Sequence, residues 1–217
     1  MSVTHTGSLE GSHGASSAGL TEALGGVAAV VLTILGLAHV APSLLVAIAT
    51  IAVSIDLLAQ GYFVGSEYVR QVRASAEPVV SVSMSGGWSF AFLSGIAGIV
   101  LGILALLQVA PEVLIAAAAV AIGGGLVIGS GGVAQIAGFR LLTPVASERM
   151  RSLVFESTAS MGIVQAMVGL AVIVLGVLAL SGFSPLPLLL VALLACGSYF
   201  VVTSSAMGGI MLSIFHT

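Results

Sequence analysis

Residues 95–131 read GIAGIVLGILALLQVAPEVLIAAAAVAIGGGLVIGSG, two apolar runs joined at Pro111. The same pattern recurs around Pro42 and Pro185. A glycine lies sixteen residues before each proline and a leucine ten residues before it. A leucine follows three residues after each proline, and alanines follow seven and ten residues after it. Matches in register at so many positions predict three tandem copies of one hairpin, and such a repeat decides the architecture before any single element is assigned.

The composition predicts that lipid is the solvent for most of the chain. Apolar residues make up 59% of the sequence and charged residues 6%, whereas a soluble domain is about 25% charged. The net charge of −3 and the absence of any basic cluster argue against nucleic-acid binding. The lipid bilayer is therefore the first partner that the sequence implies.

Six apolar runs have the length of a membrane span. At a rise of about 1.5 Å per residue, about 20 residues cross a hydrocarbon core of about 30 Å. None of the runs alternates as a barrel strand does. The sequence predicts an all-α integral membrane protein, with six transmembrane helices as three tandem parallel helical-hairpin repeats. The expected spans are Glu22–Val40, Ser43–Val64, Trp88–Val109, Val113–Gln135, Met161–Leu180 and Pro187–Phe215.

The expected organisation is a flexible polar segment at residues 1–20 and a six-helix membrane domain at 21–217. The repeats cover residues 21–66, 88–137 and 161–215, and longer connections cover 67–87 and 138–160. Proline suits the first turn of a helix, so Pro42, Pro111 and Pro185 are expected at the hairpin turns, each beginning a second helix.

All five arginines lie in the two longer connections. The positive-inside rule then places these connections and both termini in the cytoplasm, and a bacterial inner membrane is the expected location. Headgroup anchoring is the favoured role of the arginines, and docking of a partner protein is the alternative. They are Arg70, Arg73, Arg140, Arg149 and Arg151.

Asp56 is the only aspartate and lies inside an apolar run, with Gln60 one helical turn further on. An ionisable side chain inside a span is costly and is a candidate functional site. Two interpretations remain open: a proton or cation site formed by Asp56 and Gln60, or a carboxylate near the interface that is hydrogen-bonded or paired with an arginine. The equivalent positions in the other repeats are Gly125 and Tyr199.

Glycines recur at positions suited to helix contacts. Small residues let helices approach closely in lipid. For the glycine-rich residues 123–132, this favours a tight helix crossing over a pivot or a backbone-lined pore wall. The candidate packing positions are Gly26, Gly95, Gly169, Gly125 and Gly129.

The remaining polar residues give no sign of catalysis. Glu112 suits the first turn of a helix through the helix dipole, and the four histidines, His39 among them, have no metal-ligand spacing. Phosphate-binding loops and nucleophile-elbow motifs are missing. Cys196, the only cysteine, is expected to pack as a small hydrophobe. We therefore expect no enzyme activity, no cofactor and no metal.

The three repeats resemble a known family. They read GVAAVVLTILGLAHVAPSLLVAIATIAVSIDLLAQG from Gly26, residues 95–131 as quoted above, and GLAVIVLGVLALSGFSPLPLLLVALLACGSYFVVTSS from Gly169. The pattern is similar to the short repeat of the HdeD-type acid-resistance membrane proteins, over roughly Glu22 to Phe215. The resemblance implies six spans in three hairpins and a role in stress or acid tolerance.

These observations predict a non-enzymatic multi-pass membrane protein. It would be either an envelope or acid-stress protein or an accessory, structural subunit of a larger membrane assembly, with membrane-protein partners or further copies of itself. The alternative is a channel or carrier for protons or a small solute that uses Asp56 and Gln60.

Overall fold

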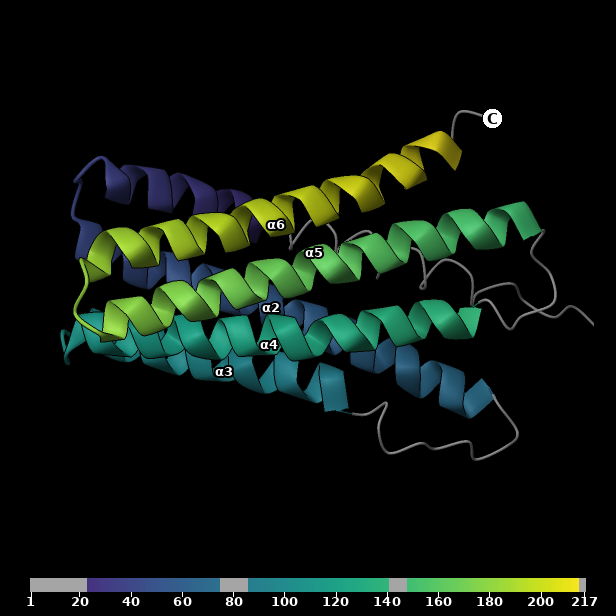
Figure 1. The fold of residues 1–217 in the computed structure, drawn as a ribbon, viewed down its shortest axis with the longest axis horizontal. Helices are drawn as coiled ribbons and strands as arrows, with labels where there is room; N and C mark the ends of the chain where they lie inside the picture. Colours follow the sequence, from purple (N-terminus) through teal and green to yellow (C-terminus); the bar gives the residue numbers. More distant parts are fainter. Residues whose placement is uncertain (1–22, 75–85, 141–147, 215–217) are drawn as a thin grey trace, which may run out of the picture.

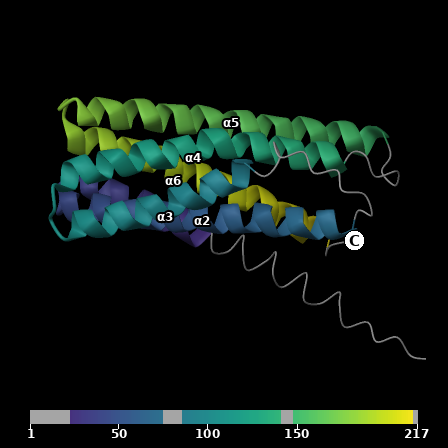
Figure 2. The ribbon, with the colours of Figure 1, turned by 90° about the horizontal axis from the view of Figure 1, so that it is seen from below.

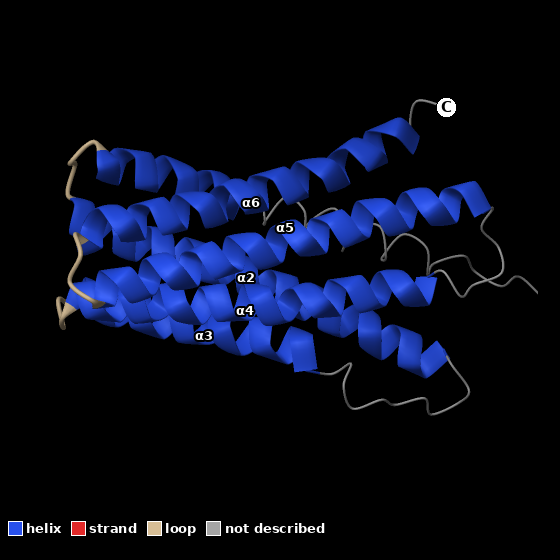
Figure 3. Cartoon of the chain, viewed as in Figure 1, coloured by secondary structure: helices blue, strands red, loops and turns tan. Residues whose placement is uncertain are grey.

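The chain folds into helices that run side by side along one axis (Figures 1 and 2). The computed structural model describes residues 23–74, 86–140 and 148–214. Over these residues the only regular secondary structure is helical (Figure 3). An N-terminal helix, Ala23–Leu37, is followed by α2 (Pro42–Ala74), α3 (Gly86–Leu106), α4 (Pro111–Arg140), α5 (Glu148–Leu180) and α6 (Pro185–Ile214).

Five of these helices are long and apolar enough to cross a membrane. Their candidate spans are 18 to 21 residues long, and the described part of the N-terminal helix is apolar but shorter. The chain thus has the topology of an all-helical, multi-pass membrane protein. Of the six expected spans, five have spanning length in the described residues. The five are Pro42–Tyr62, Ser89–Leu106, Pro111–Gly131, Gly162–Leu180 and Pro185–Ser204.

Three short turns lie together at one end of the bundle, the turn end (left in Figure 3). Each turn closes a hairpin: the N-terminal helix with α2 (hairpin 1), α3 with α4 (hairpin 2), and α5 with α6 (hairpin 3). As predicted, Pro42, Pro111 and Pro185 each begin a second helix, where the missing proline N–H costs no helical hydrogen bond. The opposite end of the bundle is called the loop end below.

The three turns share one backbone conformation. Three residues before each proline, a residue with positive φ ends the first helix: His39 (φ 65°), Gln108 (φ 60°) and Gly182 (φ 84°). Its N–H donates to a carbonyl three residues back, and the next N–H donates to a carbonyl five residues back, as in Val40 to Leu35 at 3.3 Å. These paired bonds are a Schellman cap, which satisfies the carbonyls at the end of a helix.

The helices continue beyond the spans at the loop end, into the two longer connections. α2 runs on to Ala74, α4 ends at Arg140 and α5 begins at Glu148. Residues 67–74, 138–140 and 148–160 are therefore helical. The charged residues of these stretches are good helix formers. All five arginines lie in these helical extensions, and their side chains, like residues 1–22, fall outside the described part of the structure.

The second helices form the interior and the first helices the outside. Within their spans, 44%, 50% and 44% of α2, α4 and α6 is buried, against 28% of α3 and 28% of α5. α2, α4 and α6 also contact one another. Side chains four, seven, eleven and fifteen residues after each proline form four interior layers, all at most 1% exposed. The layers are Val46, Ile115 and Leu189; Ala49, Ala118 and Ala192; Val53, Ile122 and Cys196; and Leu57, Leu126 and Phe200.

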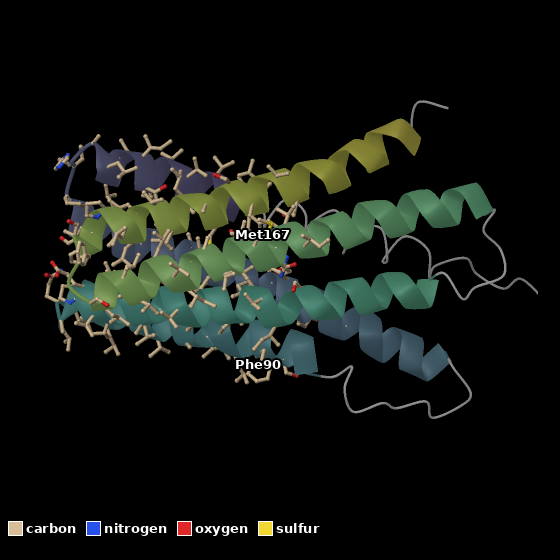
Figure 4. All side chains as sticks on the ribbon, in the orientation of Figure 1. Phe90 and Met167 are labelled. Atoms are coloured by element: carbon tan, nitrogen blue, oxygen red, sulfur yellow. The ribbon has the colours of Figure 1, made fainter. Side chains whose placement is uncertain are left out.

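The outer surface is apolar, as a lipid-facing surface must be. Phe90 on α3 is 51% exposed and Met167 on α5 is 67% exposed (Figure 4). Aliphatic side chains of the N-terminal helix, among them Leu24 and Ile34, are exposed in the same way.

Candidate functional site

Asp56 lies in the interior of hairpin 1. It is fourteen residues into α2, about 21 Å from Pro42 along the helix, and its exposed fraction is 0%. The carboxylate lies against Gly25 of the N-terminal helix, so close that a Cβ on Gly25 would overlap it. The structure thus pairs Asp56 with a glycine, and Gly25 is the residue that makes room for the carboxylate.

Gln60 lies one turn further along α2 and is partly buried. The two predicted site residues therefore share one helix and the loop-side half of hairpin 1. The sequence did not single out Gly25, because its contact with Asp56 joins two helices and no local pattern reports it.

The equivalent level of hairpin 2 has the opposite arrangement. Gly125 replaces the aspartate, and Ser94 of α3 stands where hairpin 1 has Gly25. A Cβ on Gly125 would overlap the Ser94 hydroxyl, which donates to the Ala91 carbonyl at 3.0 Å. Gly125 was predicted as a packing residue, and its neighbour is a side chain of its own hairpin. In both hairpins a glycine faces the larger polar side chain, so the same space is filled from opposite helices.

In hairpin 3, the position equivalent to Asp56 takes part in a hydrogen bond between two side chains. The Tyr199 hydroxyl of α6 donates to Gln165 Oε1 of α5 at 3.0 Å, and the two residues are 7% and 2% exposed. Gln165 Nε2 lies 3.5 Å from the position that a Cβ on Gly129 would occupy. Gly129, predicted as a packing residue, therefore gives space to the amide from α4.

Gln165 is the functional candidate that sequence reasoning missed. A signal was present, because Gln165 is the only amide in the run Met161–Leu180. Tyr199 was noted as the position equivalent to Asp56, although its partner on α5 was not. A buried hydrogen bond between spans holds α5 to α6 and contributes about 0.6 kcal/mol in comparable proteins.

The other buried hydroxyls are satisfied within their own helices. Each donates to the carbonyl four residues back, at 2.6 to 2.8 Å, and this local bond is the usual arrangement for hydroxyls in a helix. These hydroxyls therefore add no reactive group to the level of Asp56. They belong to Thr33, Thr50, Ser54 and Ser204.

Gly26, Gly95 and Gly169 lie at close crossings between hairpins. A Cβ on Gly169 would be 2.8 Å from the Gly123 carbonyl oxygen, and one on Gly95 would be 2.9 Å from the Ser54 carbonyl oxygen. On Gly26 it would be 3.1 Å from the carbonyl oxygen of Gly197. Every one of these contacts is made by a first helix against the second helix of another hairpin. All three glycines, predicted as packing residues, therefore lie where two helices approach closely.

Glu112 and His39 lie at the turn end and are exposed. Glu112 occupies the first turn of α4, as predicted from the helix dipole. Among the residues that the structure describes, no group of three or more His, Cys, Asp or Glu is placed to hold a metal ion. Cys196 is fully buried in the third interior layer.

Comparisons of the chain with protein-family models, with curated proteins and with solved structures found no match. The function is therefore inferred from the geometry of the bundle and of the surroundings of Asp56.

Proposed function

We propose that this chain is a non-enzymatic membrane protein that acts through helix contacts in the bilayer, as an envelope or acid-stress protein or as an accessory subunit of a membrane assembly. The observation that carries the proposal is the filled interior. Four successive layers of α2, α4 and α6 consist of side chains at most 1% exposed. Through these four layers of described residues, the centre of the bundle leaves no route for a solute.

We also infer that the three hairpins are tandem repeats arranged around one axis. The same Schellman turn closes each hairpin, and the interior layers come from equivalent positions of the three second helices. Equivalent glycines lie at the contacts of the N-terminal helix with α6, of α3 with α2, and of α5 with α4. These three contacts make a closed ring of hairpins.

The arginines favour an orientation with the loop end in the cytoplasm of a bacterial inner membrane. All five are found in the helical extensions at that end, and positively charged segments stay on the cytoplasmic side. A reporter fused to the C-terminus, active only in the cytoplasm, tests this orientation.

Resemblance to the HdeD-type repeat supports the acid-stress form of the proposal. It rests on the early glycine, the proline turn and the long apolar second helix of each repeat. Survival of acid exposure, compared between cells with and without the gene, is the direct test. Equal survival of the two strains would leave the accessory-subunit form.

Gentle purification of a tagged copy from its native membranes tests the proposal as a whole. Mass spectrometry and particle size are read together. Partner proteins in stoichiometric amounts would support the accessory-subunit form, and a homo-oligomer would support an autonomous membrane protein. A lone monomer with no co-purifying protein would contradict association as the mode of action.

A proton or small-solute carrier is the second candidate, because Asp56 is a fully buried carboxylate within a span. Such a path would pass between the helices of hairpin 1, since the central layers are filled. Flux into liposomes is compared for the wild type and Asp56→Asn, which keeps the size of the side chain and removes its ionisable group. Flux above that of empty vesicles that is lost in Asp56→Asn would favour the carrier. Equal background flux in both would exclude it.

A further inference from the structure

A pocket opens between hairpins 2 and 3 at the turn end. Its volume is about 210 Å³, which is below the roughly 300–1,000 Å³ of pockets that hold a whole drug-sized molecule. It therefore has room for a headgroup-sized part of a ligand. The lining residues are Glu112, Val113, Ala179, Leu180, Gly182 and Pro185.

The pocket lies where the hydrocarbon core meets the lipid headgroups. The candidate spans of α4 and α6 begin at Pro111 and Pro185, and that of α5 ends at Leu180, so three span ends surround the pocket. Val113 and Leu180 are 58% and 47% exposed and continue into the lipid-facing surface. A molecule that fills the pocket is therefore in contact with apolar, lipid-facing side chains on one side.

Glu112 gives the pocket a negative charge. Among the described residues it is the only acidic one at the turn end, and all five arginines lie at the loop end. His39, the other ionisable residue of the turns, belongs to hairpin 1. A carboxylate beside apolar side chains favours a cation that carries an apolar tail. A hydrogen bond from an ammonium group to a carboxylate is about twice as strong as one between neutral groups.

The combination of an acidic residue with an open mouth is specific to this contact between hairpins. A Cβ on Gly182 would have nothing within 4 Å, so the glycine leaves the mouth of the pocket without a side chain. The equivalent residues of Gly182 and Glu112 are Gln108 and Ser43 where hairpin 2 meets α2, and His39 and Leu186 where hairpin 1 meets α6. Neither of these contacts has both the glycine and the carboxylate.

We propose that this pocket binds the headgroup of a phospholipid with a primary ammonium group, of the phosphatidylethanolamine class. The ammonium donates to the Glu112 carboxylate, and the acyl chains lie on the apolar surface beside Val113 and Leu180. A soluble amine has no part for this apolar rim to hold, so the bilayer is the source of the ligand. The inference is independent of the proposed function, because the site needs neither a partner protein nor a second copy of the chain.

Native mass spectrometry of the full chain in detergent tests the site. The purified protein is stripped of lipid and titrated with phosphatidylethanolamine, phosphatidylcholine or phosphatidylglycerol of the same acyl chains, and the fraction that carries one lipid gives each dissociation constant. Phosphatidylcholine keeps the positive charge without an N–H donor, and phosphatidylglycerol is anionic. We expect phosphatidylethanolamine to bind about fivefold more tightly than either of them, or better.

Substitutions separate the charge from the shape of the pocket. Glu112→Gln keeps the size of the side chain and should remove the preference for phosphatidylethanolamine. Gly182→Gln copies Gln108 of hairpin 2 and should cover the mouth with the same result, and Val113→Trp blocks the lipid-facing side if Gly182→Gln does not fold. The matched control is Glu112→Gln with Ser43→Glu. It restores the charge of the turn end at the equivalent position of α2 and should not restore binding.

Equal affinity of the wild type and Glu112→Gln for phosphatidylethanolamine would overturn the inference, and so would equal affinity of the wild type for the three lipids. Recovery of the preference in the double variant would overturn it as well, because the charge of the surface would then be sufficient without the pocket. Free ethanolamine is the soluble probe. If it bound as tightly as the lipid, the bilayer would not be the source of the ligand.

Discussion

At the scale of single residues, Asp56 and Gly25 behave as one unit. In hairpin 2 the glycine and the polar residue are on the opposite helices: Ser94 lies on the first helix and Gly125 on the second. The two hairpins therefore fill the same space from opposite helices. We expect Gly25→Ser to lower the free energy of unfolding by about 1–3 kcal/mol, because the new side chain overlaps the carboxylate. Adding Asp56→Gly should restore most of the loss, since the double variant reproduces the pair of hairpin 2.

Titration of the purified variants with a denaturing detergent measures these free energies. The matched control is Ala28→Ser, which places the same hydroxyl on the exposed face of the same helix and should change stability by less than about 0.5 kcal/mol. Strictly additive effects of Gly25→Ser and Asp56→Gly would show that the two positions are not coupled.

The hairpin turns carry a strain that glycine can relieve. His39 and Gln108 have φ of 65° and 60°, whereas the third hairpin uses Gly182 at φ 84°. For a residue that has a Cβ, the left-handed backbone conformation is less favourable by about 1 kcal/mol. We expect His39→Gly and Gln108→Gly each to stabilise the protein by up to about 1 kcal/mol, and Gly182→Ala to destabilise it by a similar amount.

Thermal unfolding of the variants in detergent is the measurement. Ser181→Gly is the control, since Ser181 does not have positive φ and glycine there gains nothing from the turn. A gain of stability in the control as large as that in His39→Gly would contradict the explanation by φ.

At the scale of helices, the crossing of α4 and α5 is a contact between backbones. A Cβ on Gly123 would lie 2.6 Å from the Gly169 carbonyl oxygen, whereas Gly124 has nothing within 4 Å of its Cβ position. Gly123→Ala should therefore push the helices apart and cost about 2 kcal/mol or more, since backbone atoms cannot move aside as a side chain tip does. Gly124→Ala, the adjacent control, should be neutral or stabilising by helix propensity.

The detergent titration applied to these two variants separates the effect of the crossing from that of the glycine itself. Equal destabilisation by Gly123→Ala and Gly124→Ala would mean that α4 needs glycine for its own conformation. The close approach of α5 would then not be the reason that glycine is needed at Gly123.

At the scale of the whole molecule, the single cysteine reports on the interior. Cys196 lies in the third layer with 0% exposure, and maleimide reacts with a thiolate in contact with water. We expect wild-type Cys196 in membranes to resist water-soluble maleimide from either side and to react on denaturation. His39→Cys with Cys196→Ala, at the exposed turn end, should label quickly. Rapid labelling of wild-type Cys196 would show water in the centre of the bundle and would favour a channel.

Much of the architecture follows from the sequence because its causes are local. A proline can begin a helix but not continue one, so Pro42, Pro111 and Pro185 locate the turns, and runs of apolar residues locate the spans. The helical extensions at the loop end follow from local causes as well, since arginine and glutamate are good helix formers. Two pairs were not identified from the sequence: Gly25 with Asp56, and Gln165 with Tyr199. Each pair joins two helices, and its two residues are more than thirty positions apart in the chain.

Hydropathy and turn chemistry act over a few neighbouring residues, so the amino-acid sequence is enough to predict an apolar, helical chain organised around three proline turns. The tertiary structure was needed to show which helices lie inside, which glycines lie at crossings, and which side chains surround Asp56 and its equivalents. Those features depend on contacts between helix surfaces that are far apart in the chain. Such contacts depend on the shapes of both surfaces together.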